Sequence, residues 1–311
     1  MRMKNAAWMK AAVRTHDVAR IRNVVRTSLR FAVLTLVALA LAAAPLPLRA
    51  QNDEALMPDQ SAAKAKVLLQ QEIAALGGQA YLTVHDYVCE GRLAQFGHSG
   101  DVTGYPPFKD FWILPDKNRT EWDKKATIVD LFAGNQGWSL DRSGVNDQSA
   151  QAIADFREQI RVDMDNVLRF RLNEDGMTFR YAGPDIVDLQ QIDWVELVDK
   201  NDTTMRFALD ASTHLPIQYQ VITRNPVTRE RSEKDTLYSE YIPIDGVNTP
   251  RKVSQTQDGR EIYAAAYTGC QYNTNLDAYL FTKKSLDDRY AQEPKPKSQK
   301  PAPPTHPAPS H

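Results

Sequence analysis

The stretch IVDLFAGNQGWSLDR, Ile128–Arg142, decides the fold class of this chain. Apolar and polar residues alternate along it, and the chain reverses at the Gly-Asn-Gln-Gly turn of residues 134–137 before it resumes with Trp138. Alternation with a period of two on both sides of such a turn predicts a β-hairpin. Trp138, at the start of the return strand, then belongs either to an ordinary core or to the wall of a ligand cavity.

The same alternation extends far beyond the hairpin in both directions. Short strands at regular spacing, joined by hairpin turns, indicate an antiparallel sheet and not βαβ units. A twisted sheet of about ten strands tends to curl, which leaves one concave apolar face to be covered. Apart from the hairpin itself, strands are predicted over residues 81–96, 108–115, 119–122, 127–132, 177–183, 193–199, 203–210, 215–222, 233–242 and 260–273.

Two helices are predicted to cover this sheet. The first runs from Asp59 to Leu76 and ends at Gly77-Gly78, and the second is an amphipathic helix inserted between strands from Asp147 to Leu172. The fold class is therefore α+β, mainly antiparallel β: a curled, incomplete β-barrel closed by an N-terminal helix and an inserted amphipathic helix. The apolar residues expected to act as a lid are Leu69, Ile73, Phe156, Ile160 and Met164.

The two ends of the chain differ from the domain between them. Residues 1–50 hold an apolar run preceded by four arginines and followed by a small-residue cleavage pattern, which is typical of a secretory signal peptide. An uncleaved membrane anchor is the alternative. Residues 51–58 form a linker, residues 59–290 the domain, and residues 291–311 a Pro- and Lys-rich tail that is expected to be disordered.

The charge of the exported part argues against nucleic acid as a partner. The chain has 38 Lys and Arg against 39 Asp and Glu, but nine of the basic and one of the acidic residues lie in residues 1–50, so the remainder carries a net charge of −9. Such a chain repels phosphate backbones. Two cysteines, Cys89 and Cys270, lie in the first and last predicted strands; in an oxidising compartment they either form a disulfide or remain separate buried thiols.

Catalytic and metal-binding patterns do not stand out. His85, His98 and His214 each stand alone, no serine-nucleophile or phosphate-binding loop is present, and the carboxylates are spaced as on any amphipathic surface. We therefore expect no enzyme activity, no metal and no cofactor. The prominent feature is instead the number of large aromatic and apolar side chains on the predicted strands, which either fill the core or line a pocket for an apolar ligand. The candidates for a pocket are Trp112, Trp122, Phe132, Trp138, Trp194, Met205, Phe207 and Tyr219.

Five segments follow one another in a recognisable order along residues 60–285: FWILPDKNRTEWD (111–123), IVDLFAGNQGWSLD (128–141), FALDASTHLPIQYQV (207–221), YIPIDGVNTPRKV (241–253) and NLDAYLFT (275–282). Their order resembles the LolA/LolB superfamily, in its outer membrane lipoprotein-sorting branch. The resemblance implies a LolA/LolB-like half-barrel in the periplasm that shelters lipid or lipoprotein acyl chains. It also implies inner- or outer-membrane envelope proteins as further partners, and we expect a monomer.

Two residues depart from the pattern of that superfamily. Its best-known carriers have an arginine just before the strand-ending proline, which latches the lid helices; here Leu114 stands there, and Arg119 is the nearest candidate latch. The last segment is expected to be a closing strand, but lacks the usual proline after Phe281. Three hypotheses follow: a carrier of acyl chains, an envelope interaction or sensor-type domain of the same fold without lipid cargo, and, as a remainder, a hydrolase.

Overall fold

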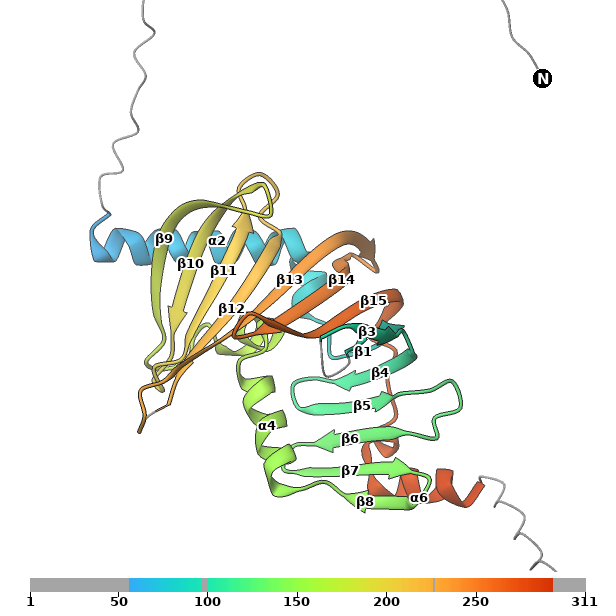
Figure 1. Cartoon of the computed structure of the whole chain (residues 1–311). Coiled ribbons are helices and arrows are strands. Elements are labelled where there is room, and N and C mark those ends of the chain that lie inside the picture. The colour runs from blue at the N-terminus through green and yellow to red at the C-terminus, as the bar shows by residue number, and fades with distance from the viewer. Residues whose placement is uncertain (1–55, 97–99, 226, 293–311) are drawn as a thin grey trace, which may run out of the picture. The chain divides into compact units, whose positions relative to one another are not determined.

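The computed structural model describes residues 56–96, 100–225 and 227–292 (Figure 1). The predicted signal peptide with its anchor alternative, most of the linker, His98 and the tail beyond residue 292 lie outside these ranges.

A single sheet of 13 strands dominates the described chain, and every neighbouring pair in it is antiparallel. Its order is β8-β7-β6-β5-β4-β1-β15-β14-β13-β12-β11-β10-β9. The strands thus form two runs in chain order, β1 with β4–β8 and β9–β15, joined where the first strand, β1, pairs with the last, β15. Strands β8 and β9 are the two edges and do not pair with each other. The predicted antiparallel, unclosed sheet is confirmed, and Figure 1 shows how far the strand direction turns between β9 and β8.

The strands of this sheet are β1 (Asp86–Leu93), β4 (Pro107–Ile113), β5 (Lys117–Glu121), β6 (Val129–Ala133), β7 (Gln136–Asp141), β8 (Gly144–Asp147), β9 (Thr178–Val187), β10 (Gln190–Val198), β11 (Thr204–Asp210), β12 (Pro216–Arg224), β13 (Arg231–Ile244), β14 (Val247–Gln257) and β15 (Arg260–Tyr272). A separate small hairpin pairs β2 (Gln95–Phe96) with β3 (Val102–Gly104).

Helix α2 (Pro58–Leu76) packs against β9 and one face of the neighbouring strands, which we call the inner face. Leu69 is fully buried there with Phe207 and Met205 of β11, and Ile73 packs against the same core. The helix ends at Gly77, whose φ of +131° and whose approach to the Gly246 carbonyl leave no room for a Cβ atom. The first predicted helix is therefore confirmed and fixed to the β13–β14 turn.

The opposite, outer face of the sheet carries two smaller cores. One lies on β4–β7 and is covered by the 3-10 turn Ala278–Phe281 and helix α6 (Lys283–Gln292), with Phe281 and Leu286 buried in it. The other lies on β10–β12 around Ile192 and Trp194. The prediction of a closing strand over residues 275–282 is wrong. Asp277 accepts a hydrogen bond from the Tyr279 N–H, starting a helical turn instead.

The inserted helix is also shorter than predicted. The segment forms α4 (Ala150–Arg161), a one-turn helix α5 (Met164–Asn166) and a π-helical turn Val167–Arg171. The break has a local cause: the Asp163 side chain accepts a hydrogen bond from the Asn166 N–H and starts a new helical turn. The single helix over 147–172 is therefore wrong in its length, although the segment does cover the inner face.

Three further strand predictions need correction. The predicted strand 81–96 begins only at Asp86, because Gln79–Leu82 forms the short helix α3, in which Tyr81 is buried. Strands β8 and β14 were not predicted. The two cysteines do form a disulfide, Cys89–Cys270, between the paired positions of β1 and β15, which excludes the alternative of separate thiols.

Candidate functional site

A cavity of about 620 Å³ lies on the inner face of the sheet. Its walls come from β1, β4–β6 and β12–β15, and its cover from α4, α5 and the π-helical turn. The same face carries the packed core under α2, so this face is filled at its β9–β12 end and hollow beyond it. Volumes of about 300–1,000 Å³ are usual for small-molecule pockets.

The strand register sets one row of large side chains along the cavity wall. Tyr272 of β15 lies opposite Tyr87 of β1, which lies opposite Trp112 of β4, and the row continues through Asn118 to Phe132 of β6. The rings of Tyr87 and Trp112 are stacked with centroids 6.1 Å apart. Because cross-strand partners project from the same face, the register alone makes this row continuous.

A second row, two residues further along each strand, is polar. Cys89 lies opposite Asp110, Asp110 opposite Thr120, and Thr120 opposite Asp130. Asp110 accepts hydrogen bonds from Trp112 Nε1, Asn118 Nδ2 and Thr120 Oγ1, each at 2.7 Å. Asp130 accepts from Trp122 Nε1 at 2.6 Å. Burial raises the pKa of Asp110, although these hydrogen bonds oppose the shift.

Helix α4 covers the aromatic row through a single side chain. Phe156 is the one buried residue of this helix, and its ring stacks on Phe132 with centroids 4.5 Å apart and planes at 13°. It also stacks on Trp112 at 6.1 Å. A helix held over a cavity by one aromatic anchor can be released at a small cost in free energy, so α4 is a candidate lid.

The polar end of the cavity lies under α5 and the π-helical turn. Tyr81 donates a hydrogen bond from its hydroxyl to Asp165 Oδ1 at 2.5 Å, and the Arg169 guanidinium lies 4.0 Å from the centre of the Tyr81 ring. Arg169 Nη1 lies 3.5 Å from Asp165 Oδ2. Burial, with Asp165 nearby, raises the pKa of Asp163 to about 7.

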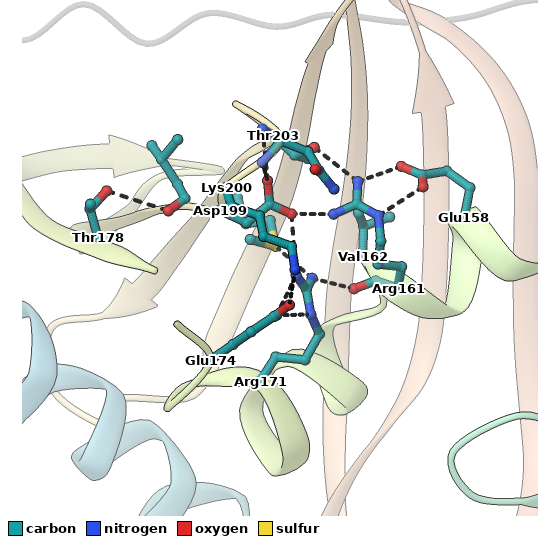
Figure 2. Close-up of polar contacts among 12 residues, drawn as sticks. Glu158, Arg161, Val162, Arg171, Glu174, Thr178, Asp199, Lys200 and Thr203 are labelled. Atoms are coloured by element: carbon teal, nitrogen blue, oxygen red, sulfur yellow. Dashed lines mark hydrogen bonds and ion pairs between the residues drawn. The ribbon is translucent and has the colours of Figure 1, made fainter. Parts of the chain in front are cut away.

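The covering segment is anchored at its C-terminal end by an ion-pair network, shown in Figure 2. The buried Asp199 carboxylate, in the β10–β11 turn, accepts from Arg161 at the end of α4 and, at 3.2 Å, from Arg171 of the π-helical turn. Arg171 also donates to the Arg161 carbonyl, and Arg161 donates to Thr203. This network fixes one end of α4 to the sheet, and Phe156 is the one buried side chain of the helix that faces the cavity.

The residues predicted from the sequence are divided by the structure into three groups. Trp112, Trp122, Phe132, Tyr219, Phe156 and Met164 line the cavity. Leu69, Met205 and Phe207 are buried in the packed core beside it, against which Ile73 also packs. Outside both lie Ile160, which lines a second pocket of about 600 Å³ behind α4, and Trp138, Trp194 and Arg119.

Trp138, Trp194 and Arg119 lie on the outer face, as their strand positions and their contacts show. Trp138 pairs with Leu131 and packs in the core under α6, because its face is opposite to that of Phe132. Trp194 packs in the outer core, with the Arg206 guanidinium 4.2 Å from its ring. Arg119 donates to the Leu280 carbonyl and to Ser285, both in the C-terminal segment. It therefore holds that segment and does not fit the predicted latch on the inner-face helices.

Of the tyrosines that line the cavity, only Tyr219 was among the residues predicted from the sequence. Burial raises the pKa of Tyr263 and of Tyr272 to about 12. The signal for the tyrosines on β1, β13 and β15 lay in strand positions that share a face, but the predicted candidates were taken mainly from the tryptophans and phenylalanines of the other strands. The tyrosines that line the cavity are Tyr81, Tyr87, Tyr219, Tyr238, Tyr241, Tyr263, Tyr267 and Tyr272.

Two further observations concern only the described residues. Among them, no three His, Cys, Asp or Glu side chains are grouped in a way that could hold a metal ion. None of the helices in the same ranges is both long enough and apolar enough to cross a membrane.

An open, curled antiparallel sheet with a ligand-sized cavity on its inner face defines the structural class. Among the solved structures similar to it is a DUF1329 family protein from Desulfovibrio piger ATCC 29098, at 15% identity and a TM-score of 0.50, covering 71% of this chain and 98% of that one. A putative outer membrane lipoprotein-sorting protein domain from Vibrio parahaemolyticus has 12% identity, coverages of 73% and 99%, and a TM-score of 0.49. A LolA superfamily protein from Nitrosomonas europaea has 12% identity, coverages of 71% and 99%, and a TM-score of 0.46.

At these identities the likeness concerns the fold alone. The structural likeness supports a fold shared with the DUF1329 family protein. The sequence matches no protein-family model, and no curated protein matches it at a significant level.

Proposed function

We propose that the protein is a periplasmic carrier or binding protein that shelters acyl chains of lipids or lipoproteins in the inner-face cavity. The observation that carries the proposal is the cavity itself: about 620 Å³, walled by the aromatic row and covered by a helix with one aromatic anchor. Trp112, Trp122, Phe132 and Tyr219 are the wall residues, and Phe156 and Met164 belong to the cover.

The energetics of chain transfer support this role. Each CH₂ group removed from water contributes about 0.8 kcal/mol, so a twelve-carbon chain contributes about 9 kcal/mol before the cost of association is subtracted. An aromatic-lined cavity of this size is sufficient to hold such a chain out of water. A cover that opens then provides entry and exit.

Native mass spectrometry of the full chain, purified from membranes without added lipid, tests the proposal. We expect an adduct of lipid mass that disappears under denaturing conditions. Val253 of β14 lines the cavity. Leu237 lies on the neighbouring strand β13, next to Tyr238, the cross-strand partner of Val253, and is 40% exposed. Val253→Trp places a bulky ring inside the cavity and should reduce the adduct strongly, whereas Leu237→Trp is the matched control and should keep it.

A clean apo mass, with no uptake of a fluorescent fatty acid by the wild-type chain, would contradict the proposal. That result would favour the alternative of an interaction or sensor-type domain without lipid cargo.

A further inference from the structure

The cavity has an uneven balance of charge, which bears on the kind of amphiphile it accepts. Among the described residues, two cationic side chains line it, Arg169 and Lys234, and Arg169 already pairs with one of the carboxylates, Asp165. The carboxylates that line the cavity are Asp110, Asp130, Asp155, Asp163 and Asp165.

Most of these carboxylates lack a cationic partner. Within the part of the chain that the structure describes, Asp165 alone among the five forms an ion pair. Asp110 and Asp130 are held by neutral donors, the indole N–H groups of Trp112 and Trp122 among them. Their positions are therefore fixed while their charges remain uncompensated.

The carboxylates face the cavity from two sides. Asp110 and Asp130 project from the sheet, on either side of Thr120, whereas Asp155 and Asp163 belong to the covering segment. In a site of reduced dielectric, ionised carboxylates that surround a ligand in this way repel an anion and attract a cation. Asp163, with a pKa of about 7, adds its full charge only above that pH. Lys234 supplies a positive charge on β13 against these carboxylates, although burial lowers its pKa.

Aromatic faces lie beside the polar second row, which holds Asp110 and Asp130 and which we call the acidic row. Trp112 lies two residues from Asp110 on the same face of β4, and the ring of Tyr87 stacks on the ring of Trp112. Aromatic faces attract cations, and ammonium groups are commonly held by such faces together with carboxylates. The two rows therefore combine an apolar surface for a chain with a site for a positive charge.

We infer that the amphiphile taken up by the cavity carries a positively charged group, of the ammonium class, held between the acidic row of the sheet and the carboxylates of the covering segment. This inference rests on the proposed function, because it assigns the polar end of the same ligand. Its apolar chain lies along the aromatic row under Phe156.

Displacement of a neutral fluorescent probe, N-phenylnaphthylamine, from the delipidated full chain tests this inference. The competitors are matched in chain length: dodecyltrimethylammonium, dodecanoate and uncharged dodecanol, each below its critical micelle concentration and at low ionic strength. The cation should bind at least roughly tenfold more tightly than the anion. The carboxylates of the cavity raise the affinity of the cation above that of the uncharged alcohol and lower the affinity of the anion below it. The ratio should fall as salt is added.

Variants locate the effect. Two double variants should each lower the ratio of cation to anion affinity several-fold: Asp110→Asn/Asp130→Asn on the sheet and Asp155→Asn/Asp163→Asn on the covering segment. Because asparagine at 163 still caps α5, the second variant remains informative if the first does not fold. Asp175→Asn/Asp188→Asn makes the same charge change at exposed positions outside the cavity and should leave the ratio unchanged.

The outcomes separate the two proposals. Binding of the neutral probe with equal affinities for cation and anion, or with the anion preferred, overturns this inference and leaves the carrier function standing. Failure of every probe and competitor to bind overturns the carrier function, and the inference with it.

Discussion

Phe156→Ala should release α4 from the cavity without unfolding the sheet. Phe156 is the one buried side chain of this helix, and it stacks on Phe132 at 4.5 Å. Burial of a phenylalanine contributes about 1.5–3 kcal/mol, and a close aromatic pair adds about 0.5–1.5 kcal/mol. The variant should therefore lose about 2–4 kcal/mol of local docking free energy.

Hydrogen exchange followed by mass spectrometry measures this loss. The vacated space joins the existing cavity, and both ends of α4 keep their anchors, Ser149 at the N-cap and the Asp199 network at the C-terminus. Exchange of amides 150–161 should accelerate by about 30- to 700-fold, since 1.4 kcal/mol is a factor of ten. Peptides of β10–β12 should be unaffected, and Arg157→Ala, exposed on the same helix, should change neither.

If the exchange of 150–161 stayed at the wild-type rate, or rose together with that of β10–β12, Phe156 would not be a local anchor. The lid interpretation of α4 would then be refuted.

Three further predictions concern stability. Glu72 is fully buried with both carboxylate oxygens unpartnered, and burial raises its pKa well above the usual value. The free energy of unfolding should therefore fall as pH rises from about 4.3 through the folded-state pKa. Glu72→Met should flatten that slope and add about 1–3 kcal/mol, as measured by urea unfolding from pH 4 to 8. Asp199→Asn leaves Arg161 and Arg171 without their shared charge and should cost about 2–3 kcal/mol in the same assay, while Glu174→Gln, whose partner Arg171 retains Asp199, should cost under about 1 kcal/mol. Cys89→Ala/Cys270→Ala removes a link across a sequence separation of 181 residues and should lower the free energy of unfolding by up to about 5 kcal/mol; an unchanged melting temperature would contradict that.

The sequence carried much of the fold because strand alternation is a local signal. The hairpin of residues 128–142 and the strands around Met205 and Tyr219 follow from side-chain parity alone. The helix break at Asp163 and the turn at Asp277 also had local signals, since each aspartate caps the segment after it. These capping signals were outweighed by the apolar period in the first case and by a strand resemblance in the second.

The cavity residues were harder to predict because both faces of this sheet are covered. Phe132 and Trp138 were both predicted to line the cavity, but Trp138 pairs with Leu131, the neighbour of Phe132, and so lies on the other face. Nothing local shows that α6 covers the face of Trp138 and α4 that of Phe132. Which face is hollow depends on contacts far apart in sequence, such as that of Phe281 with the outer core. The same limit explains Trp194 and Arg119.

The most direct test of the account is a crystal structure of the full chain with a dodecyl amphiphile that carries bromine at its chain terminus. We predict a bromine anomalous peak inside the cavity, against the row of Tyr87, Trp112 and Phe132. Absence of a peak at saturating ligand, or a peak only on the outer face beside Trp138 or Trp194, would contradict it.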